Sequence, residues 1–197
     1  MRSNFDDPPT WGGHPARIVR SAHFAGMGYN QVEFRNLKQK GAVAAMKPIR
    51  NSAKAVIVRN DRLLLTKNED GEGYFYLFPG GGQEKGEELK DAVVRECKEE
   101  IGQEVEVEEL LFVREYIGEH HQFAEWDADV HQVEFYFRCR LTDPEADMGN
   151  GAHPDEHQVG VEWVPLSRLG EIRVYPGTLA EKLRIGVCEP CYVGDVG

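Results

Sequence analysis

The segment 80–102 constrains this chain more than any other, because a run of glycines leads there directly into an amphipathic helix. The glycines end a short apolar strand, and apolar residues return at helical spacing from residue 89 to residue 101. A stripe at steps of four runs along one edge of this helix and consists of Leu89, Val93, Cys97 and Ile101. Because such a stripe lies on one side of a helix, we expect this edge to pack against a sheet.

Three glutamates occupy the adjacent edge of the same helix. At about 100° per residue, Glu96, Glu99 and Glu100 lie within little more than one quadrant of the helix surface. Like charges at this spacing repel one another, so we expect a ligand that gains from clustered oxygens. Mg²⁺ and Mn²⁺ fit best, because both prefer carboxylate oxygens and keep water molecules. The alternative is a solvated acidic helix without a ligand, but the preceding glycines and strand favour the metal.

Apolar runs on either side of this segment predict a chain that mixes strands and helices. Asn60-Asp61 separates two of these runs and predicts a tight turn between paired strands. Residues 143–160 are rich in Pro, Gly, Asp and His and predict a loop long enough to have a function. The predicted strands are 55–58, 63–65, 74–78, 105–117, 133–141 and 161–165, and a second helix is predicted at 179–183.

Composition excludes several classes of function. The 197 residues include 34 acidic and 23 basic side chains, and the resulting net charge of −11 disfavours a general nucleic-acid binder. No apolar run approaches the roughly 20 residues that a membrane helix needs. The N-terminus lacks the apolar region of a secretory signal, and four cysteines do not make a disulfide framework. We therefore expect a soluble protein of the cytoplasm.

The two ends of the chain differ from its middle. Residues 1–45 hold six basic and three acidic residues and lack a clear hydrophobic period. We expect them to form a loosely ordered extension, followed by a folded domain at 46–186 and a C-terminal tail at 187–197. Because Met46 immediately precedes the folded pattern, we also expect the natural start to lie there. A dimer-forming extension is the alternative.

The segment 81–102 resembles the Nudix box, the signature of the MutT-like Nudix hydrolases. The match reads Gly81-x5-Glu87-x7-Arg95-Glu96-Cys97-x-Glu99-Glu100-x-Gly102, and only Gln103 departs from the aliphatic residue that is usual there. The runs 76–80, 133–139 and 162–166 also resemble strands of this family. The resemblance covers roughly residues 50–185, and chance agreement at this many fixed positions is very rare.

The resemblance implies an α/β/α sandwich with a mixed central β-sheet. It also implies hydrolysis of a pyrophosphate bond in a nucleoside diphosphate linked to another moiety, with Mg²⁺ or Mn²⁺ as cofactor. A cation is needed because an anionic pyrophosphate approaches an acidic segment only when metal ions bridge the two. Carried over by position, the implied metal ligands are Glu96, Glu99, Glu100 and the Gly80 carbonyl, and the implied supporting residues are Gly81, Glu87, Arg95 and Gly102, with Arg95 pairing with Glu87.

The resemblance leaves the general base open. In some family members a glutamate of the box acts as the base, which here is Glu99. In others a glutamate of the loop before the late strand does, and that loop contains Asp155 and Glu156. Glu156 is our candidate for a base or an additional ligand, and Glu134 on the central strand is its rival. A plain surface acid is the alternative for each.

Residues 118–132 join two predicted strands and carry several histidines and aromatic residues. We expect His120, His121 and His131, together with Glu134, to contact a small-molecule nucleotide, whereas a polar connection without a ligand is the alternative. The markers of the ADP-ribose, dinucleoside-polyphosphate and NADH subgroups are absent, so no substrate is assigned. A catalytically silent Nudix-fold module that binds nucleotides or regulates is the alternative to an enzyme. The chain is compatible with a homodimer.

The cysteines predict no further site. Cys188-Glu189-Pro190-Cys191 is a lone CxxC, for which a zinc site lacks a second pair and a thioredoxin-like site lacks its fold. We expect these two residues to be ordinary thiols. Cys139 lies within a predicted strand, so we expect it in the core.

Overall fold

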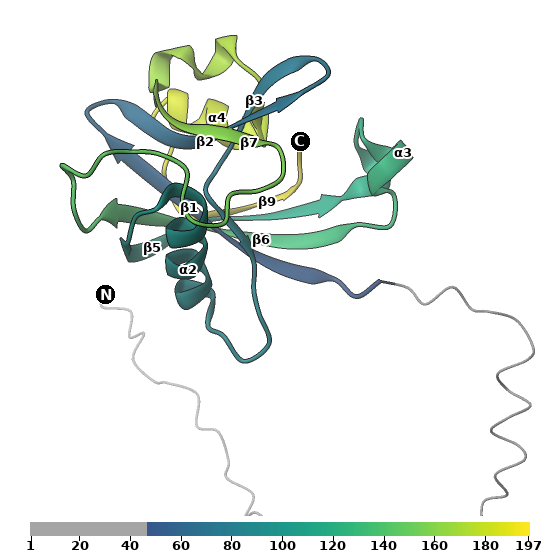
Figure 1. Cartoon of the computed structure of the whole chain (residues 1–197). Helices are drawn as coiled ribbons and strands as arrows, with labels where there is room; N and C mark the ends of the chain where they lie inside the picture. The colour runs from purple at the N-terminus through teal and green to yellow at the C-terminus, as the bar shows by residue number, and fades with distance from the viewer. Residues whose placement is uncertain (1–46) are drawn as a thin grey trace, which may run out of the picture. The chain divides into compact units, whose positions relative to one another are not determined.

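The computed structural model of the chain describes residues 47–197 (Figure 1). The expectations for residues 1–45, and for a start at Met46, lie outside the described residues. None of the described helices is long and apolar enough to cross a membrane.

The first two strands form a hairpin. β1 (Arg50–Arg59) and β2 (Arg62–Asp70) are antiparallel, and Asn60 and Asp61 connect them. Both connecting residues have positive φ, at 50° and 56°, which is the backbone of a two-residue hairpin turn and favours Asn and Asp. The predicted turn is therefore confirmed.

One mixed sheet contains all the described strands. Its order is β8-β3-β2-β1-β6-β5-β9, with β4 also pairing with β1 and β7 also pairing with β2. β1 runs parallel to β6 but antiparallel to β2 and β4. The remaining strands are β3 (Gly73–Leu77), β4 (Gly80–Gly82), β5 (Val105–Ile117), β6 (His131–Leu141), β7 (Gln158–Pro165), β8 (Val174–Tyr175) and β9 (Cys191–Asp195).

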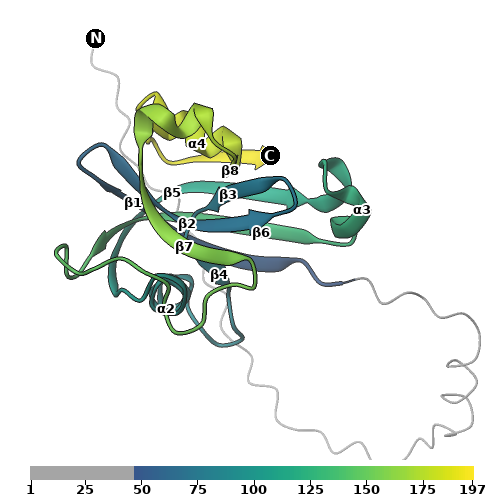
Figure 2. The same ribbon diagram turned by 45° about the horizontal axis from the view of Figure 1, so that its top comes forward.

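Helices cover both faces of this sheet, as Figure 2 shows for α2 (Leu89–Ile101) and α4 (Gly177–Arg184). Successive residues of β1 point to opposite faces. Val56 packs in the hydrophobic cluster that contains Leu179 of α4, whereas Ala55 and Ile57 pack in the cluster that contains Val93 of α2. The predicted apolar edge of α2 thus packs on the sheet, and the predicted α/β/α architecture is confirmed.

The glycines before α2, which the sequence indicated as the end of an apolar strand, form a short strand of their own, β4. β4 pairs with β1 so that Gly80 lies opposite Lys54 and Gly82 opposite Ser52. Gly80 has φ 129°, and a Cβ atom at this position would overlap the carbonyl oxygen of Ala53. Only glycine permits so close an approach of two backbones, and this approach brings the start of α2 to the sheet.

Two other segments differ from the sequence expectation. The segment 187–197, expected as a tail, contains β9, which pairs in parallel with β5. Half-buried Cys188 and Cys191 are free thiols that pack against the core, while Cys139 is buried as predicted.

The connection 118–132 contains η1 (Gly118–His120) and α3 (Ala124–Asp127), and η2 (Leu166–Glu171) follows β7. Short turns of this kind leave no clear period in a sequence.

We predict that Gly80→Ala destabilises the protein by at least about 2 kcal/mol, because it combines a strained φ with backbone overlap. Urea unfolding followed by circular dichroism measures this change. Gly149→Ala is the matched control, since a Cβ there meets no atom within 4 Å, and its effect should stay within about 0.5 kcal/mol. Equal unfolding midpoints for the two variants would contradict the proposed backbone constraint.

Candidate active site

Arg95 links the helix α2 to the loop that precedes it. Its Nε and Nη2 donate to the two carboxylate oxygens of Glu87, at 2.8 and 3.0 Å, and Nη2 also donates to the carbonyl oxygen of Gly82 at 3.0 Å. A two-pronged contact of this kind fixes both position and orientation. The hydrogen bonds from Arg95 also hold the pKa of Glu87 below its usual range. The pairing expected for these two residues is present.

The same guanidinium reaches two of the predicted metal ligands. Arg95 Nη1 lies 2.7 Å from an oxygen of Glu96 and 3.4 Å from an oxygen of Glu99. A Cβ atom on Gly81 would come within 2.7 Å of the Glu96 carboxylate, so the absence of a side chain at Gly81 leaves room for that carboxylate. Arg95 therefore brings the Glu96 and Glu99 carboxylates to one side of the loop.

Glu100 points to a different neighbour. It is buried, with 5% of its surface exposed, and it accepts a hydrogen bond of 2.8 Å from the backbone N–H of Gly80. Burial raises the pKa of Glu100 to about 7, although the positive charge of Lys54 and the Gly80 hydrogen bond oppose this rise. Lys54 Nζ donates to the carbonyl oxygen of Gly80. The residue Gly80 is thus held at its N–H by a carboxylate and at its carbonyl oxygen by an ammonium group.

The donor chemistry fits a hard divalent cation on the Glu96 and Glu99 side. Each of these carboxylates uses one oxygen toward Arg95, and no hydrogen bond involves the second oxygen within residues 47–197. Carboxylate oxygens are the ligands that Mg²⁺ and Mn²⁺ prefer. In the described part of the chain, no three acidic, His or Cys side chains already converge on one point. The three predicted glutamate ligands are thus divided between Arg95 and Gly80.

The loop 142–157 caps the end of α2. The backbone N–H groups of Gly151 and His153 donate to the carbonyls of Glu100 and Glu99, and Gln158 Nε2 donates to the Glu100 carbonyl at 2.7 Å. A Cβ atom on Gly151 would overlap the carbonyl of Glu99. These contacts satisfy carbonyls that a helix end leaves unpaired. They also fix the backbone of two predicted metal ligands.

Asp155 and Glu156 of this loop are both exposed, but they differ in the residues that they act on. Asp155 acts on Glu100 through its negative charge, which contributes to the raised pKa of Glu100. Glu156, our candidate base, is exposed, and no hydrogen bond or ion pair connects it to another residue of 47–197. Its predicted role remains a prediction, and Asp155 is the loop acid that the fold brings under the influence of the glutamates of α2.

Glu134, the rival candidate, lies inside the sheet. Its carboxylate accepts a hydrogen bond of 2.6 Å from the Tyr136 hydroxyl and forms an ion pair of 3.1 Å with Arg114. Because both charged side chains are buried, each depends on the other for compensation. His131 Nε2 lies 3.7 Å from the Glu115 carboxylate. Both residues that the sequence assigned to substrate on β6 therefore have acidic or basic neighbours within the fold.

The adjacent histidines His120 and His121 contact the C-terminal strand. They lie 2.7 and 2.6 Å from the two carboxylate oxygens of Asp195 in β9. Burial by itself raises the pKa of Asp195, but the hydrogen bonds from the two histidines outweigh this effect and lower it to about 2. The His121 ring also stacks on Tyr116, with the ring centroids 4.8 Å apart. This arrangement fixes the η1 segment against β5 and β9.

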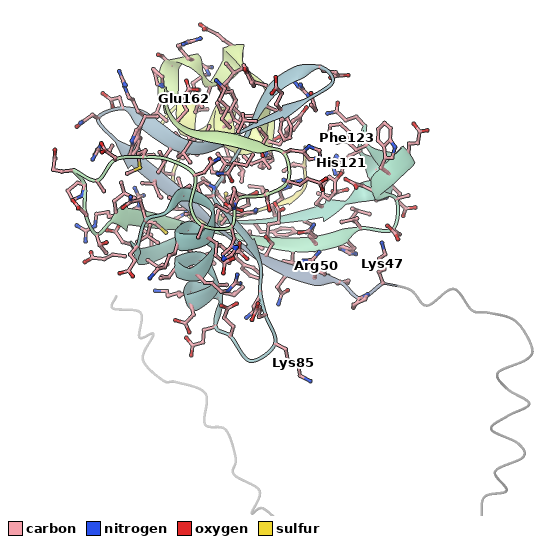
Figure 3. All side chains as sticks on the ribbon, in the orientation of Figure 1. Lys47, Arg50, Lys85, His121, Phe123 and Glu162 are labelled. Atoms are coloured by element: carbon pink, nitrogen blue, oxygen red, sulfur yellow. The ribbon has the colours of Figure 1, made fainter. Side chains whose placement is uncertain are left out.

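Aromatic rings gather beside this segment. Figure 3 shows His121 and Phe123 in the same part of the molecule, next to α3. Phe123 meets Tyr175 edge-to-face at 5.8 Å, and Tyr175 meets Phe75 in the same way at 6.2 Å. Aromatic faces of this kind suit the stacking of a nucleobase.

Sequence reasoning missed three residues that shape the site. Lys54 and Arg114 each place a charge within a strand, and a basic residue inside an otherwise apolar run was the available signal. Gln158 gave no signal of this kind, because its role depends on a contact with a helix that lies 58 positions earlier.

Comparison with known proteins identifies the fold and the family. Residues 48–182 match the family model described as the NUDIX domain. No curated protein matches the chain in sequence.

Several solved structures resemble the chain. A NUDIX hydrolase from Nitrosomonas europaea has 19% identity and a TM-score of 0.56, covering 76% of this chain and 80% of its own. A MutT NUDIX hydrolase from Burkholderia pseudomallei has 26% identity and a TM-score of 0.51, covering 68% and 96%. An ADP-ribose pyrophosphatase from Streptococcus suis has 21% identity and a TM-score of 0.50, covering 75% and 98%. They share the predicted fold.

We predict that Glu100 makes the stability of the metal-free protein depend on pH. Its pKa rises from 4.5 to about 7 on folding, so the folded state binds the proton more tightly than the unfolded state does. Stability should therefore fall as the pH rises from 4.5 to 7 and level off above 7, by about 3 kcal/mol in total. Urea unfolding in EDTA at a series of pH values measures this change.

The variant Glu100→Gln should lack this part of the pH dependence. Glu104→Gln serves as the control, because Glu104 is exposed and pairs only with exposed Lys98, so its difference from the native protein should not change with pH. Parallel stability curves for the native protein and Glu100→Gln would contradict the raised pKa.

Proposed function

The chain belongs to the NUDIX family, a family of hydrolases, and we propose that it hydrolyses a pyrophosphate bond with the help of a divalent metal ion. The substrate class is a nucleoside diphosphate linked to another moiety. One observation carries this proposal: Arg95 holds Glu96 and Glu99 together while it is itself fixed by Glu87 and Gly82. A solvated acidic helix needs no such arrangement.

Glu96 and Glu99 would hold the cation, which we propose to be Mg²⁺, with Mn²⁺ able to replace it. When bound, the ion supplies positive charge to the phosphate oxygens and lowers the pKa of a bound water. The protein contributes the position of both carboxylates. Arg95 orients them through hydrogen bonds, and Gly81 leaves the space that the Glu96 carboxylate occupies.

A carboxylate has to accept the proton of the attacking water. Glu99 supports this role because its side chain is 37% exposed and lies beside Arg95. Glu156 supports it as an exposed acid of the loop that caps α2, and its neighbour Asp155 acts on Glu100 through its charge. Glu156→Gln distinguishes these two assignments, because Glu99→Gln removes a proposed metal ligand in either case.

The far end of the substrate would lie at the aromatic rings of Phe123, Tyr175 and Phe75. The rings pack edge-to-face, Gln122 Nε2 donates to the Tyr175 hydroxyl at 3.3 Å, and the guanidinium of Arg173 lies over the Phe75 ring. The name of the Streptococcus suis neighbour, an ADP-ribose pyrophosphatase, agrees with a nucleotide derivative as the substrate.

The four free cysteines agree with a cytoplasmic location.

We predict metal-dependent turnover of at least one nucleoside diphosphate derivative. Phosphate release, coupled to a phosphatase where needed, should require Mg²⁺ or Mn²⁺ and stop in EDTA. Glu99→Gln should lower kcat by at least about a hundredfold, since it removes a proposed ligand and base.

Glu104→Gln is the matched control for this measurement. Glu104 follows the same helix but is exposed and pairs with Lys98, so its kcat should stay near that of the native protein. If the native protein hydrolyses none of the nucleoside diphosphate derivatives tested but still binds nucleotide in calorimetry, the chain is a binding module and not the proposed enzyme.

A further inference from the structure

Lys54 is a basic residue in the middle of an apolar strand. Its neighbours Ala53 and Ala55 are fully buried, and Lys54 itself is half-buried. A charged group in such a place needs a partner. The nearest strand positions are Gly80 of β4 and Tyr136 of β6, and the ammonium group donates to the Gly80 carbonyl.

The partners of Lys54 are two of the groups that the sequence assigned to a metal ion. The Gly80 carbonyl binds the ammonium directly, and the Gly80 N–H binds Glu100. The charge of Lys54 also acts on the Glu100 carboxylate. A cation that is attached to the chain therefore already binds the Gly80 carbonyl oxygen, and the Glu100 carboxylate is held by the N–H of the same residue.

The charges of the site divide into two groups. The first group contains one carboxylate, Glu100, and one ammonium, Lys54, both bound to Gly80, and so leaves no net negative charge for a divalent ion. On the other side, Glu87, Glu96 and Glu99 surround Arg95, so three carboxylates and one guanidinium leave a net charge of −2. One divalent cation matches this second group, whereas the first group needs none.

We propose that Lys54 acts as a built-in cation which excludes a divalent ion from Gly80 and Glu100. This inference rests on the proposed metal dependence and states where the metal binds: one ion at Glu96 and Glu99, and the lysine at Gly80 and Glu100. An ammonium group repels a divalent cation at short range. Because the strand tethers it, the ammonium competes with any ion from solution. Lys54 is a positioning residue in this scheme.

The test counts Mn²⁺ ions bound to the full chain, by electron paramagnetic resonance of free Mn²⁺ and by calorimetry, without any substrate. The native protein should bind one ion per chain. Lys54→Met keeps the length of the side chain and removes its charge, so this variant should gain a second ion, at least about tenfold tighter than any second ion of the native protein.

Two further variants assign the second ion. Adding Glu100→Gln to Lys54→Met should return the count to one, because the freed carboxylate is then lost. Lys85→Met is the charge control: Lys85 is exposed on the same acidic segment and points away from the fold (Figure 3), so its loss should leave the count at one. Lys54→Gln, which retains a donor for the Gly80 carbonyl, replaces Lys54→Met if circular dichroism shows that the latter is unfolded.

The outcomes separate this inference from the proposed function. One ion in both the native protein and Lys54→Met, with equal affinity, overturns the role of Lys54 and leaves the metal-dependent function standing. If the native protein binds two ions, Lys54 does not exclude a second ion, and the inference is also overturned. A native protein that binds no Mn²⁺ overturns the metal requirement itself. Only a second ion that appears with Lys54→Met and disappears with Glu100→Gln supports the inference.

Discussion

The guanidinium of Arg95 is the contact on which the candidate site depends. It joins three parts of the chain that are separate in sequence: Glu87 in the loop, the carbonyl of Gly82 in β4, and the carboxylates of α2. Because its side chain is only 26% exposed, water competes weakly for these hydrogen bonds. The loop, the strand and the helix are therefore held in one arrangement, and the geometry of the acids follows from it.

The charged neighbours of two buried acids set the electrostatics around this contact. Half-buried Lys54 acts on Glu100 through its charge, and Arg114 forms a buried ion pair with Glu134 within the sheet. Removing one member of such a pair costs more than the pair contributes, since it leaves a buried charge alone. The chain carries a net charge of −11, yet the two acids buried within residues 47–197, Glu100 and Glu134, each have a hydrogen-bond donor.

The sequence predicted those parts of the fold that repeat or alternate. The bounds of α2 and of β5 agree with their hydrophobic patterns, and the hairpin turn at Asn60 and Asp61 follows from residue type. The grouping of Glu96 and Glu99 follows from helical spacing, which depends only on neighbours in the chain. Such patterns relate residues that are separated along the chain by about one helical turn or less.

The remaining features depend on contacts between distant residues. The strand at Gly80–Gly82 exists because β1 lies beside it, and β9 exists because β5 offers an edge. The inward turn of Glu100 toward the Gly80 N–H could not be read from the helix, on which Glu100 stands next to Glu99. Lys54 was visible as a basic residue in an apolar run, but its contact with Gly80, which lies 26 positions away, was not.

The three consecutive glycines of β4 are alike in sequence but differ in what a substitution would disturb. A side chain on Gly80 would meet backbone, which cannot give way, and one on Gly81 would meet the Glu96 carboxylate. At Gly82 it would meet only the tip of the Arg50 side chain, at 2.6 Å, and a long side chain moves easily. A substitution would therefore disturb folding at the first glycine and the position of a proposed metal ligand at the second, whereas the third should tolerate a small side chain.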